Sequence, residues 1–135
     1  MASIRKETQL PVSAADVWDV VRDVGAVHTR FAPGFVTDTT LEDGARVVTF
    51  ANGLVARELI VDVDDRARRL AYAAVGGRLT HHNASFQVLE EDCDRSRLVW
   101  VADLLPDALA PVIDGMMTAG VEAIQRAFTP NPVVA

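Results

Sequence analysis

His82 and Asp103 are the two residues whose types and positions most directly suggest chemistry. An imidazole has an unperturbed pKa of about 6.5, which a neighbouring carboxylate raises and burial lowers. A histidine balanced in this way can act as a general acid or base and contribute roughly 10²–10⁴ in rate. The same pair could instead be purely structural, with the two polar groups serving as each other's partner, because a buried charge needs a partner whether or not chemistry takes place.

The predicted pairing of two strands brings these two groups together. If residues 91–96 form the end of a hairpin, the facing pairs are Val88 with Val99, Phe86 with Val101, and Ala84 with Asp103. Alternation then makes His82 and Asp103 diagonal neighbours on the inward face and turns Trp100 outward. A shift of one residue is the open alternative: it buries Glu90 and Gln87 against Leu98 and Trp100, which suits the tryptophan but not the polar side chains.

Glu58 and Tyr72 are further candidates, each with two interpretations. Glu58 could ionise in a cavity and bind a cationic or hydroxylated ligand, or it could pair with Arg57 or Arg78 outside. Tyr72 could donate its hydroxyl to a carbonyl, or it could be half-buried packing. Alternation does not decide between these, because the opposite face of the strand that carries Glu58 is equally apolar. His28 is expected to cap or line a short helix.

No metal or cofactor is expected. His81 and His82 are adjacent in a strand, so they point to opposite faces and cannot both face one ion. Cys93 is the single cysteine, and it lies between Asp92 and Asp94, whose charges disfavour a reactive thiolate. It cannot form an intramolecular disulfide, which fits a reducing compartment, and we expect a cytoplasmic protein.

The composition indicates one folded domain. The chain has 135 residues, of which 50% are hydrophobic and 24% charged, enough to form a buried core. The net charge of −6 and the lack of an extended basic cluster argue against nucleic-acid binding. No apolar run approaches the roughly 18 residues of a membrane helix, so we expect no membrane insertion.

The elements that must position these residues follow from hydrophobic periodicity. Residues 4–10 alternate as a strand, and Ser13 with Asp16 forms a capping box that begins a short helix. A second short helical piece contains His28 and Phe31. Residues 35–105 are predicted to form about six antiparallel strands joined by short turns. The final helix has one apolar stripe, formed by Leu109, Ile113, Met117, Gly120, Ile124 and Phe128.

This order predicts an α+β fold in which a curved antiparallel sheet of about seven strands wraps around the long C-terminal helix, a helix-grip fold. The domain is expected to span residues 1–128, and residues 129–135 to form a flexible tail. A strongly bent sheet is wider than one helix can fill. The architecture therefore predicts a cavity between them.

Several segments carry a resemblance to a known superfamily. The run 10–18 (LPVSAADVW) and the runs RLVW at 97–100 and LP at 105–106 resemble the strand-to-helix junction and the last strand of the START and Bet v 1-like proteins, which include polyketide cyclases and dehydrases. The runs 52–58 (NGLVARE), 64–65 (DD) and 76–79 (GGRL) are similar to the gate and latch of plant abscisic-acid receptors. Val55 replaces the gate proline, and Gly77 stands at the latch histidine, so hormone reception is not implied.

The resemblance implies a pocket for a small hydrophobic molecule, with its mouth framed by these two loops. It points to a cofactor-independent cyclase, dehydratase or isomerase in which His82, Asp103 and Glu58 act on a substrate carbonyl. The side chains expected around the ligand are Tyr72, Phe86, Ala84, Val101, Leu54, Leu79, Met117 and Trp18. The alternatives are a carrier or sensor that leaves its ligand unchanged, and a homodimer formed through an outward Trp100.

Overall fold

The structure is a computed structural model, and it describes residues 1–130. The strands are β1 (Ala2–Leu10), β2 (Val36–Glu42), β3 (Ala45–Phe50), β4 (Val55–Asp64), β5 (Arg69–Val75), β6 (His81–Asp92) and β7 (Arg95–Leu105). The helices are α1 (Ala14–Val21), a π-helical turn (Val27–Phe31), a 3₁₀ turn (Asp107–Leu109) and α2 (Ala110–Phe128). Most of the expected tail, residues 131–135, lies outside the described residues.

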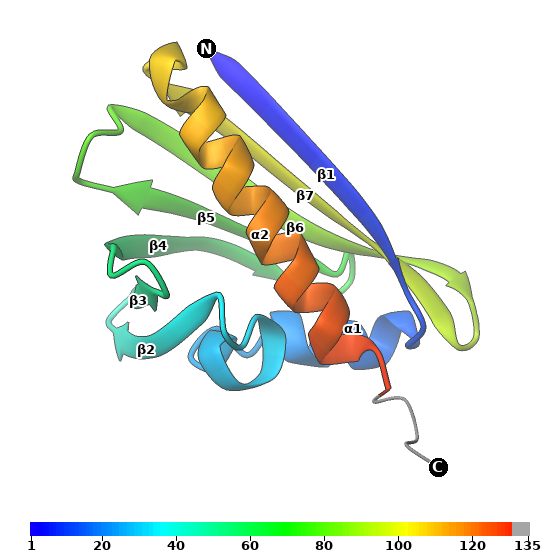
Figure 1. Ribbon diagram of the computed structural model, residues 1–135. Helices are drawn as coiled ribbons and strands as arrows, with labels where there is room; N and C mark the ends of the chain where they lie inside the picture. The colour runs from blue at the N-terminus through cyan, green and yellow to red at the C-terminus, as the bar shows by residue number, and fades with distance from the viewer. Residues whose placement is uncertain (131–135) are drawn as a thin grey trace.

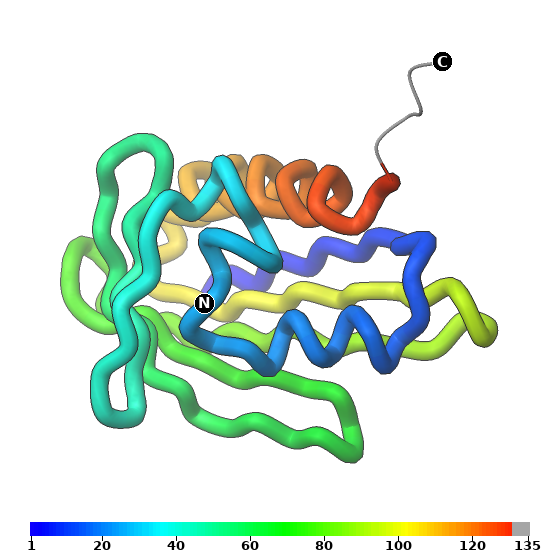
Figure 2. Tube along the Cα trace, turned by 90° about the horizontal axis from the view of Figure 1, so that it is seen from below, coloured from blue at the N-terminus to red at the C-terminus, as the bar shows by residue number. Residues whose placement is uncertain are grey.

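All seven strands form one antiparallel sheet in the order β1-β7-β6-β5-β4-β3-β2. The sheet is strongly curved, and α2 crosses its concave face (Figure 1). Seen from below, the β2–β3 hairpin stands across the direction of β1 and β7, while α1 and the π-helical turn close one end (Figure 2). This arrangement confirms the expected α+β helix-grip fold.

The two α-helices form where the sequence predicts them. The Ser13 hydroxyl accepts a hydrogen bond from the Asp16 amide at 3.2 Å, which caps the start of α1. The apolar stripe of α2 faces the sheet, with Met117, Gly120 and Ile124 buried. The second short helical piece is the π-helical turn, which contains His28 and buries Val27 and Phe31. Among the described residues, no helix is both long and apolar enough to cross a membrane.

The predicted register between β6 and β7 is wrong beyond the turn. Asp92 faces Arg95, as a simple hairpin requires, but a β-bulge between Glu90 and Asp92 shifts every later pair by one residue. The observed pairs are Val88 with Leu98, Phe86 with Trp100, and Ala84 with Ala102. The extra residue in the bulge allows the apolar rows of both strands to face inward, which a regular hairpin could not achieve.

The bulge reverses the predicted facing of β7 while leaving that of β6 as predicted. Trp100 and Leu104 point into the core. Asp103 and Val101 therefore lie on the outer, convex face, where Asp103 stands opposite Asn83 of β6 and Ser3 of β1. Because Trp100 is buried, it cannot serve as the exposed dimer contact that the predicted register suggested.

Candidate functional site

A cavity of about 360 Å³ lies between the concave face of the sheet, α2 and the π-helical turn. This volume is typical of a site for a small organic molecule. The wall is mainly apolar. Its chemistry-bearing members are Arg46, Glu58, Tyr72, Arg78 and His82. The sequence-based expectation that the sheet and the last helix leave a hollow agrees with this geometry.

Three stacked aromatic side chains form one wall of the cavity. Phe86 of β6 lies between Tyr72 of β5 and Trp100 of β7, with ring centroids 5.9 and 4.6 Å away and interplanar angles of 17° and 26°. The Trp100 indole N–H donates a hydrogen bond to the Tyr72 hydroxyl oxygen at 2.9 Å. This bond satisfies the buried indole and holds the phenol ring in place.

The Tyr72 hydroxyl has a hydrogen-bond donor that no protein group uses among the described residues. Its oxygen already accepts from Trp100, and its hydrogen has no acceptor among the described residues. Burial, and secondarily the charge of Glu58, raise the pKa of Tyr72 well above its usual value. The phenol therefore stays protonated and can donate to an oxygen atom of a bound molecule.

A buried ion pair lies beside this phenol. The Arg46 Nε of β3 donates to Glu58 Oε1 of β4 at 2.8 Å, and the two side chains are only 4% and 11% exposed. The two residues face each other directly across the strands. The Arg46 guanidinium also lies 5.2 Å from the centre of the Tyr72 ring, a cation–π distance. Glu58 Oε2 has no hydrogen-bond partner among the described residues.

Sequence reasoning missed Arg46. It named Glu58 but offered Arg57 or Arg78 as partners, whereas Arg57 pairs with Glu42 on the outside. A signal was present: a β3–β4 turn over residues 51–53 places Arg46 opposite Glu58, and opposite charges favour such cross-strand positions. The pairing of Glu58 inside the cavity also decides which face of β4 is inward near this point.

His82 lies in the cavity wall as a neutral ring with a fixed tautomer. Its Nδ1 accepts a hydrogen bond from the Ala74 amide at 2.9 Å, so the neutral ring carries its hydrogen on Nε2. Burial, and secondarily the proximity of His81, lower the pKa of His82, although Asp103 raises it slightly. His82 is therefore a hydrogen-bond donor through Nε2, and its acceptor nitrogen is already occupied.

This environment predicts a pH dependence of stability. Because the folded state holds the His82 pKa below its unfolded value of about 6.5, the unfolded chain takes up the proton more readily. The stabilisation is complete above about pH 6.5 and is lost as the pH falls through the folded pKa. We expect urea unfolding to show this loss in the wild type and a weaker one in His82→Gln. His81→Gln, an exposed control, should keep most of the wild-type loss, because burial is the larger cause of the lowered His82 pKa. The same dependence of the unfolding free energy on pH in all three proteins would contradict the assignment.

The structure brings most of the predicted site residues to the cavity and leaves four outside. The predicted residues that line it are Leu54, Glu58, Tyr72, Leu79, His82, Phe86 and Met117. Ala84 is buried in the core without reaching the cavity, and Val101 and Asp103 lie on the convex face. Trp18 belongs to α1 and lies outside the cavity lining, and its indole donates to Asp65 at 2.9 Å. The gate-like and latch-like segments both contribute to the lining.

Gly120 of α2 permits a close approach between the helix and the aromatic wall. A Cβ at this position would lie 2.8 Å from the Trp100 ring, whereas one at Gly115 would meet nothing within 4 Å. We expect Gly115→Ala to stabilise the protein by about 0.5–1 kcal/mol, because alanine favours a helix. Gly120→Ala should instead destabilise it and change the Trp100 fluorescence, because overpacking costs about 1–3 kcal/mol. Thermal unfolding and emission spectra test this, and equal responses of the two glycines would contradict it.

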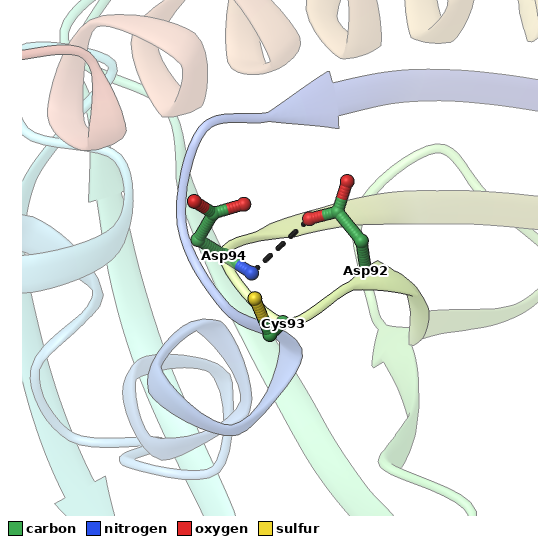
Figure 3. Close-up of side chains that lie close together, drawn as sticks. All are labelled: Asp92, Cys93 and Asp94. Atoms are coloured by element: carbon green, nitrogen blue, oxygen red, sulfur yellow. Dashed lines mark hydrogen bonds between the residues drawn. The ribbon is translucent and has the colours of Figure 1, made fainter.

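The turn between β6 and β7 contains the other cluster of potential ligand groups. Ligand atoms of Asp92, Cys93 and Asp94 lie within 4.8 Å of one another (Figure 3). The Asp94 amide and the Arg95 guanidinium both donate to Asp92, at 3.1 and 2.8 Å, and Arg95 lowers the pKa of that carboxyl. These bonds account for the geometry of the turn, so we assign it no ligand.

The comparisons with known proteins agree with this geometry. The model of the family described as "Polyketide cyclase / dehydrase and lipid transport" matches residues 1–131, and the chain belongs to this family. The comparison with curated proteins found no match. Membership and the apolar cavity together define a protein with a pocket for small hydrophobic molecules.

Three solved structures illustrate the likeness. A Thermobifida fusca protein is 30% identical, covers 94% of this chain and 93% of its own, and has a TM-score of 0.76. Norcoclaurine synthase from Thalictrum flavum is 18% identical, with coverages of 97% and 95% and a TM-score of 0.73. A START superfamily protein from Mycobacterium smegmatis is 12% identical, with coverages of 93% and 92% and a TM-score of 0.71. The last two share the fold.

Proposed function

We propose that the protein is a cofactor-independent enzyme of the cyclase or dehydratase kind, which moves a proton next to the carbonyl group of a small hydrophobic substrate. The family description, which includes polyketide cyclases and dehydrases, supports this reaction class. The observation that carries the proposal is the buried Arg46–Glu58 pair in the wall of a mainly apolar cavity, beside the Tyr72 phenol.

In the proposed first step, Glu58 is the base. Arg46 holds Oε1, so Oε2 takes the proton from the carbon next to the carbonyl. The electron pair of the broken C–H bond moves toward the carbonyl oxygen and gives an enolate. Tyr72 and His82 Nε2 donate hydrogen bonds to that oxygen, and such preorganised donors are strongest in an apolar, water-poor site.

The enolate then follows one of two routes with the same proton balance. In a cyclisation, its carbon bonds to a second carbonyl carbon, and the new alkoxide takes the proton back from Glu58. In a dehydration, the β-hydroxyl leaves as water after it receives that proton. The apolar wall holds the substrate in a folded conformation, which favours the intramolecular reaction.

These roles differ from the His82–Asp103 pair that the sequence suggested. Asp103 lies on the convex face, and the Nδ1 of His82 is occupied by the Ala74 amide. His82 therefore acts in the proposal as a donor to the substrate oxygen, while Glu58 takes the role of base.

Deuterium incorporation into a simple ketone tests the proposal. The purified protein is incubated in D₂O with 2-tetralone, a bicyclic ketone with acidic hydrogens next to its carbonyl, and exchange is followed by NMR. We expect exchange faster than in buffer, with a rate that saturates at the ketone concentrations that saturate binding. Binding without accelerated exchange would overturn the catalytic proposal.

Binding without chemistry is the second candidate function. It is favoured by the observation that the buried polar side chains of the wall already make contacts within the protein: Arg46 with Glu58, Trp100 with Tyr72, and the Ala74 amide with His82. Polar groups that are satisfied in this way can orient a ligand without transforming it. Recovery of every bound compound unchanged, with no deuterium incorporated, is the result this candidate predicts.

A further inference from the structure

The cavity lining combines a few deeply buried polar side chains with several exposed apolar ones. Arg46, Glu58 and Tyr72 are 3–8% exposed. By contrast, Leu54, Val55, Val75 and Val112, which line the same cavity, are 41–63% exposed. We call these four residues the rim. They come from the β3–β4 turn and the start of β4, the end of β5, and the first turn of α2.

We infer that the ligand is a neutral amphiphile that binds with its carbonyl end inward and its apolar end between the rim residues. This inference rests on the proposed function, since it assigns the reacting carbonyl to Tyr72 and Glu58. The inference adds the class of ligand. The ligand is longer than the enclosed part of the cavity, and its apolar end extends out of the cavity between the rim residues.

Two observations support this orientation. Exposed apolar side chains on several different elements cost free energy in water unless something covers them, and here they continue the lining of the cavity. The apolar end of the ligand can therefore cover the rim residues while it stays in contact with the apolar lining of the cavity. In addition, Arg46 and Glu58 neutralise each other, so the inner end favours a neutral oxygen over a charged head.

The competing orientation depends on Arg78, the exposed charged residue of the cavity lining. An anionic amphiphile, such as a fatty acid, could place its carboxylate at Arg78 and its chain inside. In the inferred orientation the rim and Tyr72 contribute to binding affinity, whereas in the competing orientation Arg78 does. Binding measurements on two series of ligands therefore separate the two orientations.

The test measures Kd by calorimetry for 2-alkanones of increasing length and for carboxylic acids of matching length. Each added methylene of a ketone should tighten binding by about two- to fourfold until the chain passes the rim. The double variant Leu54→Ser with Val112→Ser should weaken binding of the longest ketones about tenfold and of the shortest less than about twofold. Tyr72→Phe should weaken all ketones by one common factor, and Arg78→Gln should change none.

A matched control separates the rim from exposed apolar surface in general. Val61 and Leu89 are exposed to a similar degree but do not line the cavity. Val61→Ser with Leu89→Ser should therefore leave every Kd unchanged. The rim and control positions are exposed, so these serine variants should fold, and circular dichroism verifies that they do.

Tighter binding of the acids than of the ketones with a loss in Arg78→Gln, or no measurable ketone binding, would overturn the inference. So would a rim variant that weakens short and long ketones equally. The outcomes that concern Arg78 and chain length are independent of catalysis. Binding in the inferred orientation without deuterium exchange would contradict the proposed function alone, and exchange with Arg78-dependent binding would contradict this inference alone.

Discussion

Glu58→Ala should destabilise the protein by about 3–5 kcal/mol, because it leaves the Arg46 guanidinium buried without a counterion. Arg46 is 4% exposed in its side chain, and its remaining hydrogen bond is a long one, 3.4 Å, to the Val24 carbonyl. Water cannot replace the lost carboxylate without entering the cavity. The free energy of unfolding, measured in urea, is the quantity that reports the loss.

Glu42→Ala is the matched control for this measurement. Glu42 also accepts a hydrogen bond from an arginine on a neighbouring strand, Arg57, at 2.8 Å, but both side chains are almost half exposed. An exposed pair contributes only about 0–1 kcal/mol, so this variant should lose little. Equal losses in the two variants would mean that Arg46 and Glu58 are hydrated in solution and that the cavity wall differs from the one described.

Glu58→Gln should lower the rate of deuterium exchange into a bound ketone by about 10²–10⁴-fold, because it removes the proposed base. Glutamine has the same shape and its carbonyl oxygen can still accept from Arg46 Nε, so the cavity is preserved and binding should change little. The measurement is the exchange rate at saturating ketone, followed by NMR, with the Kd determined separately.

Two carboxylates on the outside of the sheet serve as controls for this rate. Glu42→Gln repeats the substitution in an exposed pair, and Asp103→Asn removes the acid that sequence reasoning placed beside His82. Neither should change the exchange rate appreciably. A large loss in Asp103→Asn with full activity in Glu58→Gln would contradict the assignment of Glu58 and favour the original His82–Asp103 pair.

Much of this fold could be predicted from hydrophobic periodicity and turn residues. The N-cap at Ser13, the apolar stripe of α2 and the sequence of strands from β2 to β7 all lie where the pattern placed them. The inward face of β6 was also predicted, with His82 and Phe86 in the cavity wall. These features depend on local spacing, which the sequence contains directly.

The wrong and missed predictions concern places where a single residue determines which side chains face the core. The bulge at Glu91 has no distinctive sequence signal, yet it determines whether Trp100 or Val101, and hence Leu104 or Asp103, faces the core. The candidate pair of His82 and Asp103 failed for this reason alone. Arg46 was missed because alternation in a short strand does not distinguish a buried arginine from an exposed one; only its position opposite Glu58 does.

The central claim is that a ligand carbonyl meets hydrogen-bond donors inside an apolar cavity, and its infrared stretching frequency reports this directly. For ¹³C-labelled 2-tetralone bound to the wild type, we predict a carbonyl band at lower frequency than in an alkane solvent, because Tyr72 and His82 donate to the oxygen. In Tyr72→Phe the band should move back toward the alkane value. A bound ketone whose band matches the alkane value in the wild type, or is unchanged in Tyr72→Phe, would contradict the claim.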